Sequence, residues 1–432
     1  MSDWPLPRRR FLRALSGSLA GAALVSPLEA RAAELVEVTG RLEGIRDRRA
    51  WREALRAEYL LSPEVLYVNH ASIGTIPRRV HEARVELLRM CEENPWLHMW
   101  GGAWEGARED ARAAVAGFLG TTAEGVALTH NTTEGFNLLA NGLPLAAGDE
   151  VVFTSLNHDG ASVAWHHNAR RRGFAVRRVS FPLRDAASLS REDVVQLHRD
   201  TLSPRTRVLV LPHVDNMVGI RHDVAAIATA ARDAGVEFVV VDAAQSAGMI
   251  PVAVDGLGVD AYAGSPHKWL QSAKGIGFAY LSSRIQASLE PMWVTWGQAR
   301  WAGTVRRFED YGTRNLAETV NLADAVAFQQ GLRGEFAERG YRQIRGWMRD
   351  RVDGSPRLSW HSPPRWEDGA SLVAIGVRGR SAPEVGEWLW REHRVVLRAF
   401  GDPLNALRVS PHLITTQEEL ERLFRLMEEA AT

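Results

Sequence analysis

Short apolar segments alternate with amphipathic segments in a regular order from residue 126 onward. The apolar segments VALTH, EVVFTS, AVRRVSF, TRVLVLP, EFVVVDA, DAYAGS and GFAYLSS have the length of strands, and runs with helical spacing, such as ASVAWHHNARR, separate most of them. Strands that are apolar along their whole length are buried on both faces, which is typical of a parallel sheet with helices on either side. The sequence therefore predicts an α/β domain built on a mostly parallel sheet.

The pattern changes after about residue 315. Two helical segments, AETVNLADAVAFQQGL and EFAERGYRQIRGWMRDRV, precede the short strands LVAIGV, VVLRA and ALRVS and a helix at PEVGEWLWREH. Thr416 and Glu419 stand at the spacing of a capping box, where the last helix begins. These segments predict a smaller α+β lobe at the C-terminal side, whereas residues 34–60 predict a polar helical lead-in.

Both lysines of the chain lie in one Gly-rich stretch, residues 261–280. The chain has 52 Lys and Arg residues, and every one except Lys268 and Lys274 is Arg. A guanidinium stays protonated in proteins, whereas a lysine amine loses its proton more readily and can add to a carbonyl as a Schiff-base nucleophile. The alternative is a solvated loop that kept two lysines by chance. We interpret the stretch as a site that requires an amine.

Polar residues follow three of the predicted strands. Thr132 and Thr133 follow VALTH and open a helix whose free backbone N–H groups suit an anion, although helix capping by Thr would also explain them. Asp242 ends FVVVD, where a buried carboxylate is costly unless it pairs with a cation. Lys268 follows the next strand. Because ligands of such sheets bind at the carboxyl ends of the strands, we expect these residues to meet in one site.

An anion site, a buried carboxylate and a reactive amine at successive strand ends together indicate pyridoxal phosphate (PLP). Lys268 would hold the cofactor aldehyde as a Schiff base. Asp242 would keep the pyridine nitrogen protonated, so that the ring accepts electrons. The set of three is much more specific than any of its members.

With these residues the chain resembles the class V aminotransferase superfamily of fold-type I PLP enzymes, the group that includes cysteine desulfurases and isopenicillin N epimerase. The resemblance extends from VNHASIG to RVSPHLITT. It implies an α/β PLP-transferase fold with a large, mostly parallel, seven-stranded sheet domain over residues 69–314. A smaller α+β lobe would cover residues 315–432, and an N-terminal segment, residues 33–68, would pack on it.

The resemblance also implies roles for individual residues, with Lys268 as the catalytic residue. The residues expected at the cofactor phosphate are Thr132, Thr133, Ser265 and His267. Around the ring, His158 would lie near or over it, Asn216 and Gln245 would reach the phenolic oxygen, and Asp242 would pair with the ring nitrogen. Gly312 and Thr313 would cross a dimer interface to the partner's phosphate. Arg408 would bind a substrate carboxylate bidentately.

Some positions leave alternatives open. Asp159 takes the place of His158 over the ring if the local register shifts by one residue. Residues 413–415 read Leu-Ile-Thr where the family usually has Tyr-Asn-Thr, so the neighbours of Arg408 differ from the family pattern. Lys274 would make a dimer or phosphate contact, or remain solvated.

The composition of the chain argues against several classes of function. The formal net charge is +0 at pH 7, so no basic surplus indicates a nucleic-acid partner. The single cysteine, Cys91, excludes an internal disulfide and a cysteine-rich metal site, and we predict no metal. Desulfurases of the family use a cysteine on the small lobe. Persulfide chemistry is therefore not expected of this chain.

The first 32 residues resemble a twin-arginine export signal. Arg8 and Arg9 form the pair, Phe11 and Leu12 follow, and the apolar run ALSGSLAGAALV precedes small residues around Arg31. The run is too short and too rich in Gly and Ala to span a bilayer as a stable helix. We expect the twin-arginine translocase as a partner during export, and the periplasm as the location.

Three other readings are possible. A serine hydrolase is suggested by Ser246 in AQSAG, but Ala replaces the first Gly of the nucleophile elbow and the strand ends too early. A nicotinamide enzyme is disfavoured because Gly275-Ile276-Gly277 lacks a third glycine and precedes a strand. The intact Lys268 and Asp242 argue against a non-catalytic binding protein of the PLP fold.

The sequence thus predicts an exported, homodimeric PLP enzyme that acts at the α-carbon or amino group of an amino acid or peptide-linked amine. An aminotransferase and an epimerase are both consistent with it. A PLP-dependent lyase, or an enzyme that tailors a siderophore or peptide, is the alternative.

Overall fold

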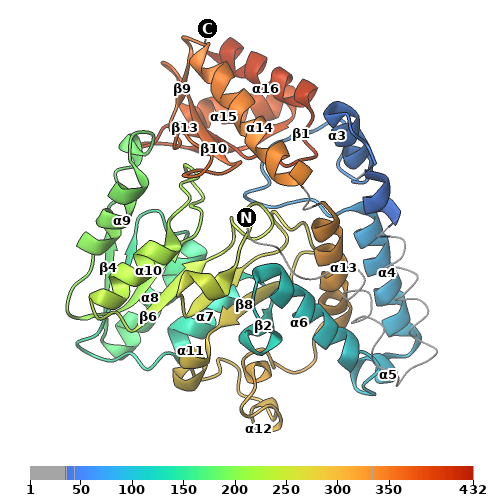
Figure 1. Ribbon diagram of the computed structural model, residues 1–432, viewed down its shortest axis with the longest axis vertical. Helices are drawn as coiled ribbons and strands as arrows, with labels where there is room; N and C mark the ends of the chain where they lie inside the picture. The colour runs from blue at the N-terminus through green and yellow to red at the C-terminus, as the bar shows by residue number, and fades with distance from the viewer. Residues whose placement is uncertain (1–34, 36, 43, 333–334, 432) are drawn as a thin grey trace.

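A seven-stranded sheet forms the centre of the computed structural model, which describes residues 35, 37–42, 44–332 and 335–431 (Figure 1). The strand order is β2-β8-β7-β6-β5-β3-β4. β8 runs antiparallel to both neighbours, and the other neighbouring pairs are parallel. The predicted seven-stranded, mostly parallel sheet is confirmed. The strands are β2 (Val126–Thr129), β3 (Glu150–Thr154), β4 (Ala175–Val179), β5 (Thr206–Pro212), β6 (Phe238–Asp242), β7 (Ala261–Gly264) and β8 (Gly277–Leu281).

Helices cover both faces of this sheet, because the strands carry apolar side chains on both faces. Along β6, Val239 and Val241 join the core under α6, α10 and α13, whereas Val240 joins the core under α7 and α8. Full burial of a valine contributes about 1.5–3 kcal/mol. The helices of these two layers are α6 (Glu105–Leu119), α10 (Val224–Asp233) and α13 (Leu316–Leu332) on one face, and α7 (Thr132–Gly142) and α8 (Asp159–Arg172) on the other.

A four-stranded antiparallel sheet, in the order β12-β13-β10-β9, forms the small lobe with three helices. The predicted capping box is present, since the Thr416 side chain accepts from the Glu419 N–H and Glu419 accepts from the Thr416 N–H. The elements are β9 (Leu358–Trp360), β10 (Val373–Val377), β12 (Arg398–Phe400), β13 (Ala406–Val409), α14 (Glu335–Asp353), α15 (Ala382–His393) and α16 (Gln417–Ala430).

Part of the N-terminal segment lies against the small lobe. Strand β1 (Leu66–Tyr67) pairs with β11 (Val395–Val396), and Arg49 of α3 (Arg48–Ala57) lies 2.8 Å from Glu418 of α16. The exact domain boundaries stay a prediction, and the predicted signal, residues 1–32, lies outside the described residues. Further helices are α4 (Arg78–Glu93), α5 (Pro95–Met99), α9 (Arg191–Asp200), α11 (Ser283–Ser288) and α12 (Gly297–Arg300).

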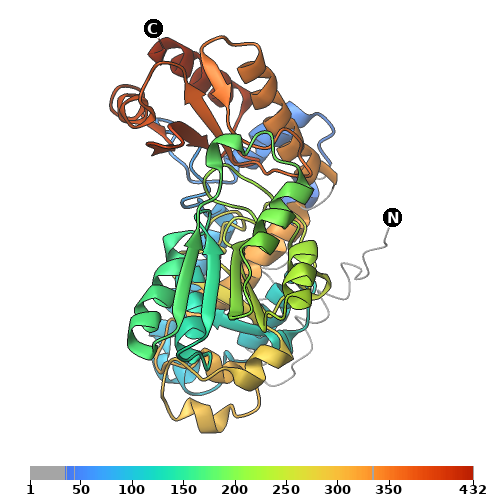
Figure 2. The ribbon, with the colours of Figure 1, turned by 90° about the vertical axis from the view of Figure 1, so that its left-hand side faces the viewer.

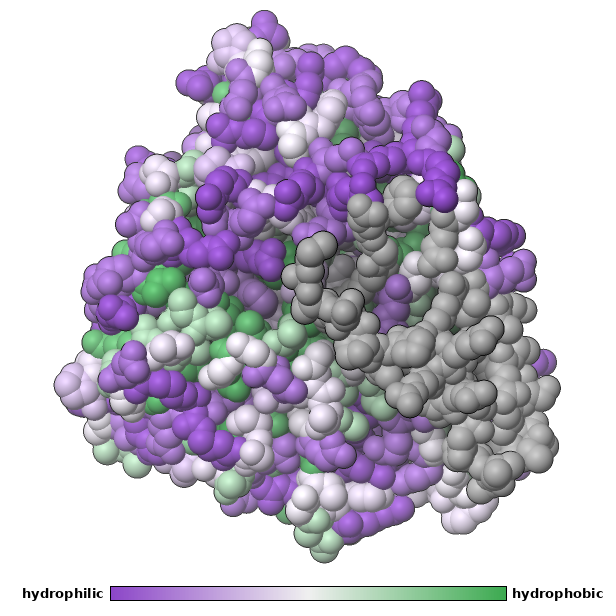
Figure 3. Space-filling view, in the orientation of Figure 1, coloured by the Kyte–Doolittle hydropathy of each residue, from purple (hydrophilic) through white to green (hydrophobic). Residues whose placement is uncertain are grey.

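The arrangement of the large sheet and the small lobe leaves the ends of the parallel strands where they can form a binding site. Figure 2 shows the small lobe at one end of the large sheet, with the arrowheads of parallel strands directed toward it. Figure 3 shows that the face over the small lobe is mostly hydrophilic, whereas hydrophobic residues gather in patches lower on the molecule. Of the helices within the described ranges, none combines the length and apolar character that crossing a bilayer requires.

Candidate active site

Three of the predicted site residues lie at the carboxyl ends of strands on one edge of the large sheet. Asp242 is the last residue of β6, Thr132 opens α7 directly after β2, and Lys268 follows β7. Because β2, β6 and β7 point the same way, their ends meet at this edge. The structure therefore brings the predicted anion site, carboxylate and amine into one region.

The turn that carries Lys268 is held by the loop over residues 69–74. The Gly74 N–H donates to the carbonyl oxygen of His267 over 2.8 Å. A Cβ atom at residue 74 would lie 2.1 Å from the Lys268 carbonyl oxygen, so only glycine allows the two backbones to come this close. The glycine of VNHASIG thus fixes the position of the lysine.

Burial shifts the pKa values of Lys268 and Asp242 in opposite directions. Burial lowers the pKa of Lys268 to about 8, although the charge of Asp242 acts in the opposite direction. Burial also raises the pKa of Asp242, and the charge of Lys268 opposes that shift. Asp242 accepts the Ala244 N–H over 2.8 Å and forms no salt bridge within the described residues. The carboxylate is therefore still available to a cationic partner.

Thr132 and Ser265 form the base of the predicted phosphate site. Both the N–H and the hydroxyl of Thr132 lie within hydrogen-bond distance of Ser265 Oγ, at 2.9 and 2.8 Å. The helix cap is Asn131, whose side chain accepts the Glu134 N–H over 2.9 Å. The alternative that Thr caps this helix is therefore wrong. Thr133 is exposed at the same helix end.

His158, which is predicted to lie over the cofactor ring, is the N-cap of α8. His158 Nδ1 accepts the Gly160 N–H over 3.0 Å, which leaves Nε2 to carry the proton of the neutral ring. Burial and the charge of Lys268 lower the pKa of His158, so its ring stays neutral near Lys268. Asp159 is the first residue of α8 and is exposed.

Gln245 and Asn216 are both held by other parts of the site. The Gln245 side chain donates to the Ala71 carbonyl oxygen and accepts from Trp269 Nε1, each over 2.8 Å. One amide hydrogen of Gln245 remains for another acceptor. Asn216 accepts a hydrogen bond from Arg408 through its backbone carbonyl oxygen.

Arg408 lies on β13 and is 3% exposed. Its Nη2 donates to Asn69 Oδ1 over 2.9 Å and to Ser72 Oγ over 2.5 Å, and its Nη1 donates to the Asn216 carbonyl oxygen over 2.8 Å. Burial and the charge of Arg398 lower the pKa of Arg408 to about 10. Nε has no partner. Sequence reasoning missed the roles of Asn69 and Ser72, although both stand in VNHASIG.

The remaining predicted residues lie at the edges of this region. His267 Nδ1 is buried without a hydrogen-bond partner, and burial and Lys268 lower the pKa of His267 to about 4. Lys274 is exposed. The Gly312 N–H donates to Asp310 Oδ1 over 3.2 Å, and Thr313 is exposed. The role predicted for Gly312 and Thr313 at the phosphate of a partner subunit stays a prediction.

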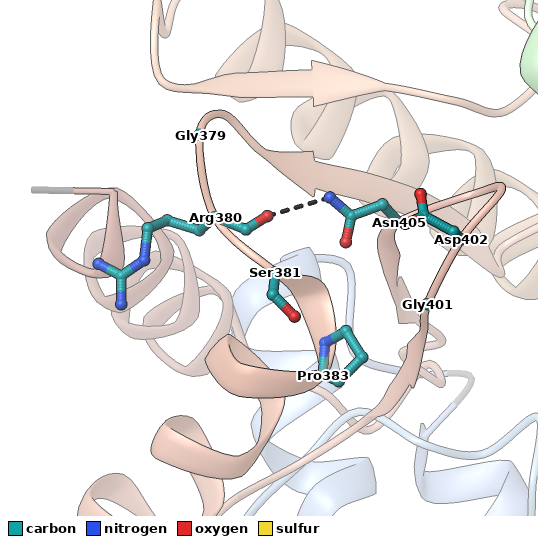
Figure 4. Close-up of a pocket in the computed structure, with 7 residues that line it drawn as sticks. All are labelled: Gly379, Arg380, Ser381, Pro383, Gly401, Asp402 and Asn405. Carbon is teal, nitrogen blue, oxygen red and sulfur yellow. Dashed lines mark hydrogen bonds between the residues drawn. The ribbon is translucent and has the colours of Figure 1, made fainter.

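Neither Ser246 nor the cavity in the small lobe offers a comparable set of reactive groups. Ser246 is 0% exposed and bonds to the hydroxyl of Tyr262 over 2.5 Å, so it is not presented as a hydrolase nucleophile. A cavity of about 390 Å³ lies in the small lobe, where Asn405 donates to the Arg380 carbonyl oxygen (Figure 4). Its lining also includes Ser381 and Asp402, and it holds neither lysine.

The residues of the candidate site fit PLP. The paired hydroxyls of Thr132 and Ser265 and the unpartnered Nδ1 of His267 suit a phosphate. A buried carboxylate without a salt bridge suits a protonated pyridine nitrogen, and an amine with a lowered pKa suits an aldehyde. The site would hold PLP between α7, the end of β6 and Lys268.

Comparisons with known proteins agree with this fit. The family model described as aminotransferase class V matches residues 66–423. Isopenicillin N epimerase of Amycolatopsis lactamdurans is 30% identical over 406 residues, covering 88% of this chain and 98% of the epimerase. A cysteine desulfurase of Klebsiella pneumoniae is 29% identical over 86% of this chain and 96% of its own length.

Solved structures show the same fold. The apo cysteine desulfurase of Thermococcus onnurineus NA1 has a TM-score of 0.74 at 25% identity, covering 88% of this chain and 98% of that one. A mutant of C-DES with glycine covalently linked to its PLP cofactor has a TM-score of 0.76 at 24% identity, covering 86% of this chain and 99% of that one. The fold, the site and the family match together lead to one conclusion: the chain belongs to the class V aminotransferase family and uses pyridoxal phosphate.

Proposed function

We propose that this enzyme moves the α-proton of an amino acid or peptide-linked amine, in an epimerase-type or aminotransferase-type reaction. Bound PLP supplies an electron sink for the charge that remains at the α-carbon. The observation that carries the proposal is Arg408, a buried guanidinium with an unpartnered Nε that shares the 69–74 loop with the Lys268 turn.

Arg408 is suited to bind a substrate carboxylate. Three of its five N–H hydrogens are donated to Asn69, Ser72 and Asn216, which fixes the plane of the guanidinium. Two N–H hydrogens remain for a ligand. A buried guanidinium is costly without an anion, so a carboxylate here would gain both charge and hydrogen bonds.

Lys268 is suited to take the α-proton. With a pKa of about 8, a substantial fraction of its amine is neutral near pH 7.5, and a general base works best when its pKa lies near the working pH. The pKa of His158 is lowered, so its ring does not add a second positive charge beside Lys268. The 69–74 loop contacts both the Lys268 turn and Arg408, which supports an α-amino acid as substrate.

Two of the relatives support the branch that returns the proton to the α-carbon, although other relatives are cysteine desulfurases. Two isopenicillin N epimerases, of Amycolatopsis lactamdurans and Streptomyces clavuligerus, match at 30% and 29% identity over 98% and 96% of their lengths. A desulfurase-type reaction is not supported, because the single cysteine, Cys91, lies on α4 in the large part.

A single-turnover experiment tests the proposal. The PLP-loaded protein is mixed in heavy water with free amino acids, and separately with dipeptides that carry a free N-terminal amine. The cofactor spectrum and the exchange of the α-hydrogen are followed together. Conversion to the pyridoxamine form indicates transamination. Exchange with return of the starting spectrum and racemised substrate indicates epimerisation. Release of ammonia and a keto acid, with the spectrum restored, indicates the lyase alternative instead.

Lys268→Ala is the matched control in this experiment. It should abolish exchange while the phosphate-site residues Thr132 and Ser265 remain in place. If exchange persists in Lys268→Ala at the wild-type rate, Lys268 is not the base and the proposal fails. If no substrate exchanges its α-hydrogen in the wild type, α-proton transfer itself is wrong.

We propose further that the enzyme works as a homodimer. The exposure of Thr313 and of four tryptophans, Trp96, Trp100, Trp293 and Trp296, supports this proposal. The rings of Trp100 and Trp296 lie 6.2 Å apart, although the two residues come from distant segments. Exposed apolar patches of this kind mark interaction sites. Sedimentation equilibrium of the PLP-loaded protein tests it, and a monomer at micromolar concentration would exclude it.

Export through the twin-arginine translocase to the periplasm is proposed from the sequence alone, since residues 1–32 lie outside the described residues. Cell fractionation of the wild type and an Arg8→Lys, Arg9→Lys variant tests it. The variant should remain in the cytoplasm. Equal distribution of the two proteins would contradict the proposal.

A further inference from the structure

Arg398 and Arg408 lie directly opposite each other on two strands of the small lobe. Arg398 begins β12, Arg408 lies on β13, and the antiparallel register of these strands pairs the two residues. Side chains at such paired positions stand on the same face of a sheet, with Cβ atoms about 4.5–5.5 Å apart, and like charges there destabilise the pair. The small lobe therefore holds a second, unfavourably placed guanidinium beside the arginine that we propose binds a carboxylate.

Both arginines lie on the sheet face that is turned away from the helices of the small lobe. Leu407, the neighbour of Arg408 on β13, joins the core that α14, α15 and α16 cover. Ala399, the neighbour of Arg398 on β12, faces α15, because a Cβ atom at Gly386 would lie 3.0 Å from the Ala399 Cβ atom. Since successive side chains of a strand point to opposite faces, Arg398 and Arg408 project from the other face.

The position of Phe400 shows that this face is directed toward the large sheet. Phe400 ends β12 and shares the face of the two arginines. It is partly buried and packs against a cluster that includes Leu156 and Val218, from the segments that follow β3 and β5. The same segments carry His158 and Asn216, which are both expected at the cofactor. The two arginines are therefore on the side of the small lobe that faces the candidate site.

Arg398 has no partner of opposite charge. Its side chain is exposed and, within the described part of the chain, forms neither a hydrogen bond nor an ion pair. Its Cζ atom lies 5.8 Å from the centroid of the Phe400 ring, and the Cζ atom of Arg408 lies 5.9 Å from the same centroid. A guanidinium at this distance is attracted to an aromatic ring. Phe400 therefore keeps both guanidiniums close to one side chain.

The charge of the two guanidiniums is only partly compensated. Arg408 donates its hydrogen bonds to neutral oxygen atoms, those of Asn69, Ser72 and Asn216. The carboxylate whose charge acts on Arg408 is Asp215, but its two oxygens already accept three backbone N–H groups. One carboxylate beside two guanidiniums leaves one positive charge for a ligand.

We propose that Arg398 binds a second carboxylate of the substrate, so that the preferred substrate is an α-amino acid, free or peptide-linked, with an acidic side chain. The inference rests on the proposed function, in which Arg408 binds the first carboxylate. A dianionic ligand would gain charge-assisted hydrogen bonds from both arginines and relieve the repulsion between them. The exposed Arg398 is the specificity-determining residue in this arrangement, and the buried Arg408 is the common anchor.

Binding of amino acids that lack an α-hydrogen tests the inference without turnover. The probes are 2-methylglutamate and 2-methylglutamine, which differ in charge but hardly in shape, and the shorter pair 2-methylaspartate and 2-methylasparagine. The change in the cofactor spectrum of the PLP-loaded protein gives the Kd of each. We expect the acid to bind roughly five-fold or more tightly than its amide in at least one pair, as for an ion pair of about 1 kcal/mol.

Arg398→Gln should bring the ratio of the two Kd values close to one. Arg391→Gln is the matched control, because Arg391 is 67% exposed on α15, where it lies 3.5 Å from Glu387, and this variant should keep the wild-type ratio. A wild type that binds acid and amide equally in both pairs would overturn the inference. So would a wild-type ratio that survives in Arg398→Gln, since an equal loss for both probes is what a merely structural role would give.

Two further results separate this inference from the function on which it rests. Arg408→Gln should weaken the acid and the amide alike, because both carry the first carboxylate; unchanged binding of both would remove the proposed role of Arg408. If none of the four probes binds while L-alanine still exchanges its α-hydrogen in heavy water, the acidic substrate class is wrong and the proposed function stands.

Discussion

The guanidinium of Arg408 donates a hydrogen bond to the side-chain oxygen of Asn69 over 2.9 Å, although 339 residues separate them in the chain. Asn69 follows β1, and Arg408 lies on β13 of the small lobe. The carbonyl oxygen of Ser410, two residues after Arg408, accepts the His70 N–H over 3.2 Å, so backbone and side chains form one junction. Arg408, which we propose binds the substrate carboxylate, is therefore positioned by the loop that also touches the Lys268 turn.

Removing the Asn69 contact should weaken the binding of carboxylate substrates. Asn69→Ala loses one hydrogen bond that orients Arg408, and the apparent Kd should rise about five-fold, which corresponds to about 1 kcal/mol. Asn69→Asp should weaken binding more, because its new carboxylate would pair with Arg408 and compete with the substrate. Spectral titration of the cofactor measures both. An amine without a carboxylate is the control, and an unchanged Kd for carboxylates in both variants would contradict this role of Asn69.

The loading of PLP into the apoprotein should depend on the protonation of Lys268. Only the neutral amine adds to an aldehyde, and burial lowers the pKa of Lys268 to about 8. The loading rate should therefore rise with pH and level off above about 8, rather than rising up to the ordinary lysine value of 10.5. Stopped-flow absorbance between pH 6 and 10 measures the midpoint.

Asp242→Asn tests the cause of that midpoint. The charge of Asp242 raises the pKa of Lys268, so its removal should move the midpoint to lower pH. Movement to higher pH, or none, would show that Asp242 and Lys268 do not interact as the structure indicates.

Ser265 and Ser246 both follow strands of the large sheet, but they should respond differently to substitution. Ser265→Ala removes a hydroxyl that lies 2.8 Å from the Thr132 hydroxyl, and the Kd for PLP should rise roughly ten-fold, as expected for a hydrogen bond to a charged group. Ser246→Ala should leave the Kd for PLP unchanged and cost about 1 kcal/mol of stability, since it loses the contact with Tyr262. Equilibrium dialysis and urea denaturation measure the two effects. Loss of all activity in Ser246→Ala would favour a serine hydrolase.

A methyl group at residue 74 should destabilise the site. In Gly74→Ala, the Cβ atom would lie 2.1 Å from the Lys268 carbonyl oxygen, so the two backbones must separate, at a cost of about 2 kcal/mol. Gly117→Ala on α6 is the control, because nothing lies within 4 Å of its Cβ position. Alanine should stabilise that helix by roughly 0.5–1 kcal/mol. The free energy of unfolding in urea measures both. Equal stability of Gly74→Ala and the wild type would mean that the loop can move away from Lys268.

Much of the fold follows from local patterns. Strands without a polar face can be buried only between two layers of helices, which is why Val239, Val240 and Val241 alone indicate a covered sheet. The capping box of Thr416 and Glu419 is equally local. The N-cap residue of α7 was harder to predict, because Asn131 and Thr132 are both good capping residues. Only the backbone geometry distinguishes them.

The sequence by itself determined the α/β class, the strand ends at which Thr132, Asp242 and Lys268 lie, and the need for an amine, because these depend on periodicity and residue type within short segments. The tertiary structure alone decided which residues hold Arg408, since Asn69 and Arg408 are 339 residues apart in the chain. It also decided the pKa of Lys268, because burial depends on segments that only folding brings together.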